Sequence, residues 1–338
     1  MKKILNLLLI TSMSAFTLWM LLKNNELGQF REVLKNVESN FIGLSVLSMV
    51  FYVGLEAVML HLLINSKGMP KRFWVSFKTT IIGQYYSLIT PFASGGQPMQ
   101  LFSLMKDGIS AHFGTAVLVN KFLVFQIGIT LYSLGLVAWR YQTLMGTIQS
   151  SAGFVFIGLT INTLGLSGIV LLVFNPEVLK RTLGRIFAFI HSVKKMKRYD
   201  ERIINLNNRI DAYTESIRYM LQHRKLLIKV SLLTMVQLTA YFSTTFFIYR
   251  ALGLESRAFI DIIAIQAILY MSISFIPSPG TAGAAEGGFL LLFGSLFTKP
   301  YIGYAVLLWR GVSYYLNLIF SGLFTLWISI RLQLKTDQ

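Results

Sequence analysis

The sequence lacks cysteine, and its four histidines, His61, His112, His191 and His223, lie far apart. Without thiols the chain forms neither disulfides nor thiolate-ligated metal sites, and the histidine spacing matches no metal-binding motif. A phosphate-cradling Gly-Lys-Ser/Thr loop is also missing, which argues against ATP-driven work by this chain alone. We therefore predict no metal, no cofactor and no catalytic residue.

Charged side chains are scarce: they make up 13% of the 338 residues, against about 25% in an ordinary soluble domain. Hydrophobic residues account for 54%, and the mean hydropathy is +0.60. Apolar runs recur from end to end, which favours a single transmembrane domain over residues 1–338. The net charge of +17 is explained by positive cytoplasmic loops and anionic headgroups, so we expect no specific nucleic-acid partner.

Six apolar runs have about the length needed to cross a hydrocarbon core of roughly 30 Å. They cover residues 4–22, 41–65, 113–139, 151–174, 231–249 and 302–330. The first follows Met1-Lys2-Lys3 and would also fit a secretory signal, although its length favours an uncleaved helix. The prediction is an all-α polytopic membrane protein.

Lysine and arginine collect on one predicted side. A basic loop at 67–72 lies on the side of the N-terminus, and residues 177–229 carry thirteen Lys/Arg against five Asp/Glu. By the positive-inside rule this side is cytoplasmic, with both termini on it, in a bacterial plasma or inner membrane.

The basic cytoplasmic segment, 175–229, contains an apolar stripe at alternating three- and four-residue steps. Its members are Ile203, Leu206, Ile210, Tyr213, Ile217 and Met220. We favour a helix lying on the cytoplasmic leaflet, with a dimerising or partner-binding helix as the alternative.

Two further apolar segments are broken by proline and glycine, at 91–98 and at 277–288. Neither half of either segment comfortably crosses the bilayer, so each is predicted to form a re-entrant helical hairpin. Pro91-x-x-x-Gly95 matches Pro279-x-x-x-Gly283 at an offset of 279 − 91 = 188. Oppositely oriented hairpins at matching positions indicate an inverted-repeat transporter with a site near the midplane. The alternative is a pair of compact interfacial loops whose glycines allow close packing.

The short helix after each break would present free N–H groups to an anion such as a headgroup phosphate, with Gly95, Gly96, Gly283 and Gly287 allowing close approach. Ionisable residues inside apolar runs are functional or paired; here they are Glu56, Lys121, Glu286 and Arg310. Glu286 would recognise a cationic headgroup, join proton coupling, or pair with Lys121 or Arg310, and pairing leads. The predicted substrate-binding set is Pro91, Gly95, Gly96, Gln97, Lys121, Pro279, Gly283, Glu286, Gly287 and Arg310.

Several spaced motifs resemble the lysylphosphatidylglycerol synthase transmembrane, flippase-like family, the membrane half of the bacterial multiple peptide resistance factor. They are QYY at 84–86, TPFASGGQP at 90–98, VNKF at 119–122, PGTAGAAEGG at 279–288 and WR at 309–310. The resemblance covers nearly the whole chain. In full-length members a soluble synthase domain follows and transfers lysine from lysyl-tRNA to phosphatidylglycerol. This chain ends at Gln338, just after the last apolar run, so we do not expect it to catalyse that transfer by itself.

The resemblance and the opposed hairpins together predict a flippase-like protein that handles phospholipid, with phosphatidylglycerol or its lysyl ester as the candidate. Two alternatives stay open: a phosphatidylglycerol lysyltransferase conferring resistance to cationic peptides, and a polyprenyl-phosphate carrier. The expected partners are membrane phospholipid and either a second copy of the chain or a separate synthase.

Overall fold

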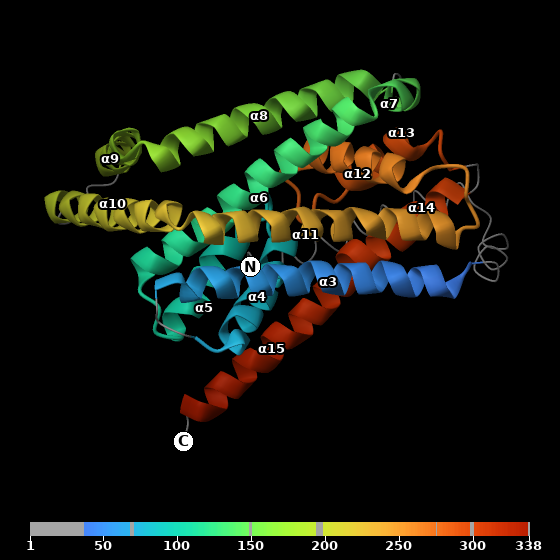
Figure 1. The fold of residues 1–338 in the computed structure, drawn as a ribbon. Coiled ribbons are helices and arrows are strands. Elements are labelled where there is room, and N and C mark those ends of the chain that lie inside the picture. The colour runs from blue at the N-terminus through green and yellow to red at the C-terminus, as the bar shows by residue number, and fades with distance from the viewer. Residues whose placement is uncertain are drawn as a thin grey trace.

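The computed structural model describes residues 37–67, 71–148, 151–193, 199–274, 276–297 and 301–336. Every secondary-structure element in these ranges is helical, as Figure 1 shows. The predicted all-α class is confirmed. The first apolar run, 4–22, and the question of a signal sequence lie outside the described residues.

Five helical segments in the described ranges are long and apolar enough to cross a membrane. They are α3 (Ser39–Ile64), α6 (Ala111–Trp139), α8 (Ala152–Phe174), α11 (Arg224–Ala251) and the continuous segment Tyr301–Arg331. The last comprises α14 (Tyr301–Arg310), a π-helical stretch (Gly311–Leu316) and α15 (Asn317–Thr336). Each predicted run from residue 41 onward therefore contains a long helix.

The helix α11 begins at Arg224, well before the apolar run that starts at Ser231. Arginine, lysine and leucine between these positions are good helix formers, so the helix continues past the point where the apolar pattern ends. Hydropathy marks the part of a helix that lies in lipid and not its full length.

The two broken segments form the predicted helical hairpins. The first consists of α4 (Phe73–Leu88) and α5 (Gly96–Lys106), and the second of α12 (Phe259–Ile273) and α13 (Ala284–Phe293). At about 1.5 Å per residue, none of the four helices spans a bilayer core by itself. In Figure 1 the α4–α5 hairpin and the α12–α13 hairpin lie in opposite halves of the molecule.

The two halves of the chain pack as an internal repeat. At its centre α3 packs along α11; around them α4 packs against α15 and α12 against α6. The helices α5 and α13 begin at Gly96 and Ala284, again 284 − 96 = 188 residues apart. The hairpin turns are alike too, because Phe92 and Ala93 have positive φ (55° and 52°) and so do Gly280 and Thr281 (58° and 54°), 188 residues later.

The main hydrophobic core lies among α11, α12, α13 and α14, and α12 is buried over almost its whole length. By contrast, α8 exposes large apolar side chains along its outer face, including Phe156, Ile157 and Leu164. An apolar exposed face on a long apolar helix is the surface that lipid covers.

Beyond α8 the chain forms α9 (Pro176–Val193) and α10 (Tyr199–Gln222). The predicted stripe of α10 is partly packed on this chain, because Ile210 and Ile217 are buried and α10 contacts α6 and α9. This differs from the expectation of a helix lying on the leaflet. The reason is connectivity: only His223 separates α10 from α11, so α10 runs on along the bundle (Figure 1).

Candidate functional site

The tips of the two hairpins touch each other. Pro91 and Pro279 form an isolated antiparallel β-bridge, and the Tyr314 hydroxyl donates a hydrogen bond to the carbonyl of Leu88 at 3.4 Å. Three non-glycine residues at the tips, Phe92, Ala93 and Thr281, have left-handed backbone conformations. Such strain clusters at functional sites, because the surrounding structure must hold it in place.

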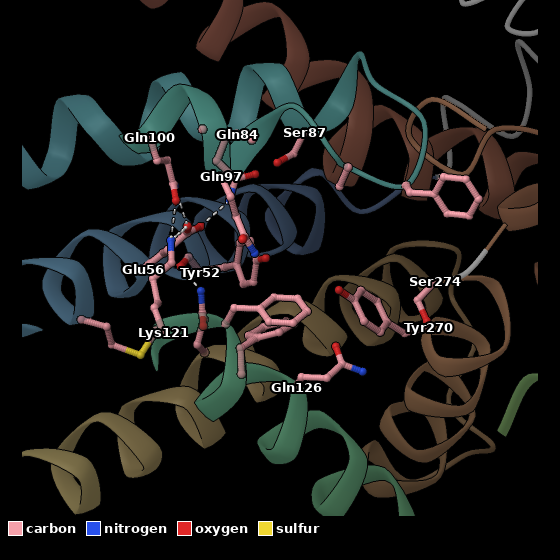
Figure 2. A pocket seen from close by; sticks show the side chains of 18 of the residues that line it. Tyr52, Glu56, Gln84, Ser87, Gln97, Gln100, Lys121, Gln126, Tyr270 and Ser274 are labelled. Carbon is pink, nitrogen blue, oxygen red and sulfur yellow. Dashed lines mark hydrogen bonds and ion pairs between the residues drawn. The ribbon is translucent and has the colours of Figure 1, made fainter. Parts of the chain in front are cut away.

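A cavity of about 410 Å³ lies beside these tips (Figure 2). Its wall comes from α3, α4, α5, α6, α8, α11 and α12, so both repeats contribute. Polar side chains project into it from helices that are otherwise apolar. The labelled members are Tyr52, Glu56, Gln84, Ser87, Gln97, Gln100, Lys121, Gln126, Tyr270 and Ser274.

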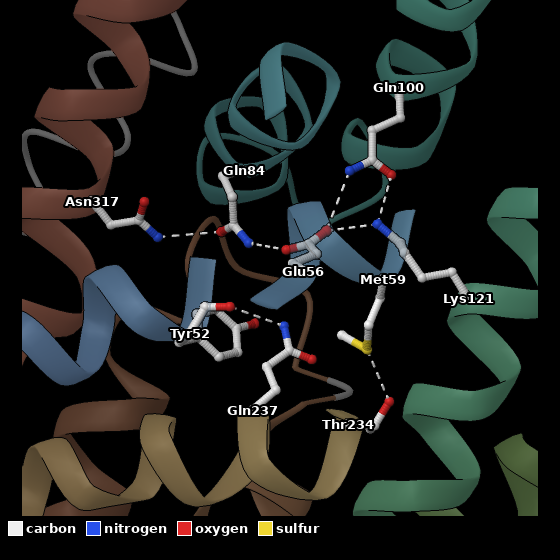
Figure 3. Close-up of polar contacts among 9 residues, drawn as sticks. All are labelled: Tyr52, Glu56, Met59, Gln84, Gln100, Lys121, Thr234, Gln237 and Asn317. Atoms are coloured by element: carbon white, nitrogen blue, oxygen red, sulfur yellow. Dashed lines mark hydrogen bonds and ion pairs between the residues drawn. The ribbon is translucent and has the colours of Figure 1, made fainter. Parts of the chain in front are cut away.

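Glu56 on α3 is the centre of the polar network in this cavity (Figure 3). Its carboxylate accepts hydrogen bonds from Lys121 Nζ at 2.6 Å, from Gln84 Nε2 at 2.5 Å and from Gln100 Nε2 at 3.3 Å. Lys121 also donates to Gln100 Oε1 at 3.1 Å, and Asn317 Nδ2 donates to Gln84 Oε1 at 3.2 Å. The network thus joins four helices of the first repeat to α15 of the second.

Close packing of α4 on α5 brings the two amides to Glu56. A Cβ atom at Gly83 would overlap the Gln100 side chain, and one at Gly96 would overlap the Ser87 hydroxyl. Because neither glycine carries a side chain, the two halves of the hairpin approach closely enough for Gln84 and Gln100 to share one carboxylate.

Glu56 and Lys121 each leave only 13% of the side chain exposed. Removing either partner would leave an unpaired charge at a poorly solvated position, a large penalty. Together they contribute no net charge but offer one cation and one anion to a ligand, with amide donors and acceptors around them. Such a site suits an amphiphile whose headgroup is both charged and hydrogen-bonding.

A second ion pair stabilises the turn of the second hairpin. Arg310 Nε donates to Glu286 Oε1 at 2.7 Å, with both side chains less than a tenth exposed. Glu286 also accepts from the backbone N–H of Gly283 at 2.6 Å, while Arg310 donates to the carbonyl of Gly280 at 3.0 Å. The leading expectation for Glu286, pairing, is therefore met by Arg310, whereas Lys121 pairs with Glu56.

The predicted site residues fall into groups. Gly96, Gln97 and Lys121 line the central cavity. Arg310 lines a smaller neighbouring cavity of about 210 Å³, together with Gly280 and Tyr314. Glu286 is buried and paired with Arg310, and Pro91 and Pro279 join the tips.

The four glycine N–H groups expected to face a phosphate are instead bonded within the hairpins. Gly95 donates to the Thr90 hydroxyl at 2.9 Å, Gly96 to Ala93 at 3.2 Å, Gly283 to Glu286 at 2.6 Å and Gly287 to Gly283 at 3.0 Å. The tight turns satisfy their own donors. In this conformation, an anion in the cavity meets side chains and not these backbone N–H groups.

Sequence reasoning missed several members of the site. Glu56 was recognised as an ionisable residue in an apolar run but not placed with the hairpins, and Gln84, Gln100 and Asn317 were not assigned to the site. Their common signal is an amide or carboxyl group inside an apolar helix, a costly position unless the group is paired or functional.

Comparison with known proteins agrees with this architecture. Residues 3–321 match the family described as "Lysylphosphatidylglycerol synthase TM region". The chain is 25% identical over 309 residues to a protein named "UPF0104 membrane protein" from Archaeoglobus fulgidus, covering 86% of this chain and 87% of the relative. The chain therefore belongs to the lysylphosphatidylglycerol synthase transmembrane family and is a multi-pass membrane protein.

Proposed function

We propose that this member of the lysylphosphatidylglycerol synthase transmembrane family moves phospholipid across the bilayer, with the headgroup passing through the central cavity. The observation that carries the proposal is the position of the Glu56–Lys121 pair. It lies in a cavity beside the touching tips of two hairpins, one from each repeat. Ionisable groups inside apolar helices are costly, and a pair of them that faces a cavity is typical of a pathway for a polar or charged substrate.

The chemistry of the cavity supports a phospholipid headgroup. Lys121 would bind the phosphate, while Glu56 would accept hydrogen bonds from a glycerol hydroxyl or a lysyl ammonium group. Phosphatidylglycerol and its lysyl ester are thus the candidate cargoes. A polyprenyl phosphate offers a phosphate but no ammonium group, so it would use Lys121 and leave Glu56 without a ligand.

Exchange of partners would allow movement. A headgroup that binds Lys121 weakens its bond to Glu56, which retains Gln84 and Gln100 as donors. Because Gln84 also accepts a hydrogen bond from Asn317 of the other repeat, a change in the hydrogen bonds of Glu56 would alter a contact between the two repeats. Rocking of the repeats about the hairpin tips would then expose the cavity to each leaflet in turn.

The orientation that we propose places the end of the molecule carrying α9, α10 and the α5–α6 loop in the cytoplasm. We call this the basic end. The segment 177–229, which includes α9 and α10, carries thirteen Lys/Arg against five Asp/Glu, and the positive-inside rule assigns such a basic segment to the cytoplasmic side of the plasma membrane.

The test is a headgroup-movement assay in proteoliposomes with phosphatidylglycerol, lysyl-phosphatidylglycerol and a short polyprenyl phosphate. We expect movement of one or both phospholipids by the intact chain and loss of movement in Glu56→Gln. Movement of the polyprenyl phosphate alone would identify that carrier role instead. If no lipid moves in intact protein with native helicity, the proposal is wrong.

A further inference from the structure

A second cavity, of about 720 Å³, opens at the basic end among α5, α6, α8, α9 and α10. Four of its polar residues are exposed and form its rim: His112, Asn205, Asn208 and Arg209. Its apolar residues are partly or fully buried: Leu101, Val119, Leu172, Val173, Leu179 and Ile210. A polar rim around an apolar floor is the shape of a site for an amphiphile.

This cavity adjoins the central one along three shared helices. On α5, Gln100 lines the central cavity and Leu101 lines the second one. On α8, Ile169 lines the central cavity and Leu172 lines the second one. On α6, Lys121 and Val119 are divided between the two cavities in the same way. These steps are no longer than about one helical turn of 5.4 Å, so the two cavities lie next to each other.

The surroundings place the opening at a membrane surface. The helix α9 has no buried residue, and it exposes Phe189 and Val193 (69% and 74%) while also carrying Lys180, Arg181 and Arg185. An amphipathic basic helix with a bare apolar face lies in the headgroup region of a leaflet. A neighbouring cavity is therefore within reach of lipids in that leaflet.

An ion pair holds this region together. Lys180 Nζ on α9 lies 2.7 Å from Asp211 Oδ1 on α10, and this hydrogen bond raises the pKa of Lys180. The pair joins the two helices beside the cavity, whereas Arg209, two residues before Asp211 on α10, lines the rim. The excess of cations in residues 177–229 attracts anionic lipids to this end.

We propose that the second cavity is a binding site for an anionic phospholipid of the adjacent leaflet, with Arg209 contacting the phosphate and Leu172, Leu179 and Ile210 contacting an acyl chain. The binding site stands on this geometry alone. Its further role, supplying lipid to the central cavity, rests on the proposed function.

The experiment uses the full chain in vesicles containing phosphatidylglycerol with a photoactivatable group on an acyl chain, and maps labelled peptides by mass spectrometry. We compare Arg209→Gln with Arg202→Gln, which removes an exposed charge from the same helix outside the cavity. A charge-assisted contact predicts roughly a tenfold loss of labelling at 172–179 and 205–212 in Arg209→Gln only. The phosphatidylcholine analogue should label these peptides several-fold less in the intact chain.

A second pair of variants tests the apolar floor. Leu172→Trp fills the cavity and should lower labelling, whereas Leu171→Trp adds the same bulk to the exposed neighbour on α8 and should not. Equal labelling in Arg209→Gln and Arg202→Gln, or equal labelling by both lipids, would overturn the proposal. Loss of labelling when inorganic phosphate is added before irradiation would also overturn it, because the site would then bind a soluble anion.

The outcome is separable from that of the proposed function. Glu56→Gln should abolish headgroup movement but keep the labelling at 172–179. Labelling without movement of any lipid, even by the intact chain, would leave the binding site standing and reject transport.

Discussion

Pro91 and Pro279 face each other across an antiparallel bridge, although 188 residues separate them in the chain. Each proline stands at the same position of its repeat, in the turn between the two helices of a hairpin. The contact between these equivalent positions fixes the two tips against each other and places the Glu56 network beside the junction. The candidate site therefore lies where the two repeats meet.

The Glu56–Lys121 pair should matter for both stability and transport. Glu56→Gln leaves the Lys121 ammonium with amide partners only, so we expect unfolding free energy to fall by about 2–4 kcal/mol. Thermal unfolding in detergent measures the change. The double variant Glu56→Gln/Lys121→Gln should recover part of the lost unfolding free energy, since no unpaired charge remains. If the double variant loses as much unfolding free energy as the two single variants added together, this account is contradicted.

The Glu286–Arg310 pair should stabilise the second hairpin. With both side chains more buried than those of the first pair, Arg310→Gln should cost about 3–5 kcal/mol. Amide hydrogen exchange at 280–287 should rise most, because Gly280 and Gly283 lose their clamp. The control is Arg250→Gln, whose partner Glu255 is largely exposed and whose loss should cost no more than about 1 kcal/mol. Equal effects of the two variants would refute the clamp.

Two glycines of the second hairpin should respond in opposite ways to alanine. Gly280 has φ of +58° and the Tyr314 ring fills the place of a Cβ atom, so Gly280→Ala should destabilise the chain by more than about 1 kcal/mol. Beside Gly287 the space is open and the residue is helical. Gly287→Ala should therefore be neutral or stabilising by up to about 1 kcal/mol. Thermal unfolding distinguishes them; strong destabilisation by Gly287→Ala would point to a contact absent from this conformation.

The proposed orientation is testable because the natural chain contains no cysteine. Ser110→Cys and Ala258→Cys each introduce one thiol at an exposed residue just before a helix, at the two ends of the molecule. In intact cells an impermeant maleimide should label Cys at 258 and not at 110; after lysis both should react. The reverse pattern would invert the orientation.

Much of the architecture followed from local patterns in the sequence. Apolar runs long enough for a bilayer predicted the long helices, and the breaks at 91–98 and 277–288 predicted the hairpins, because lipid enforces hydrogen bonding within each segment. The offset of 188 predicted the repeat, and the matching φ angles of Ala93 and Thr281 confirm it at the level of the backbone.

The polar contacts depended on packing that no local pattern records. Glu56 and Lys121 are 65 residues apart. Their network forms only where α3, α4, α5 and α6 meet, and Gly83 and Gly96 allow α4 and α5 to approach closely enough for this. From the sequence, the glycine N–H groups were expected to be free to bind a phosphate, but in the folded chain they donate to acceptors within the turns. Hydropathy acts on single helices, whereas the partner of each buried charge depends on which helices meet, and that is a property of the assembled bundle.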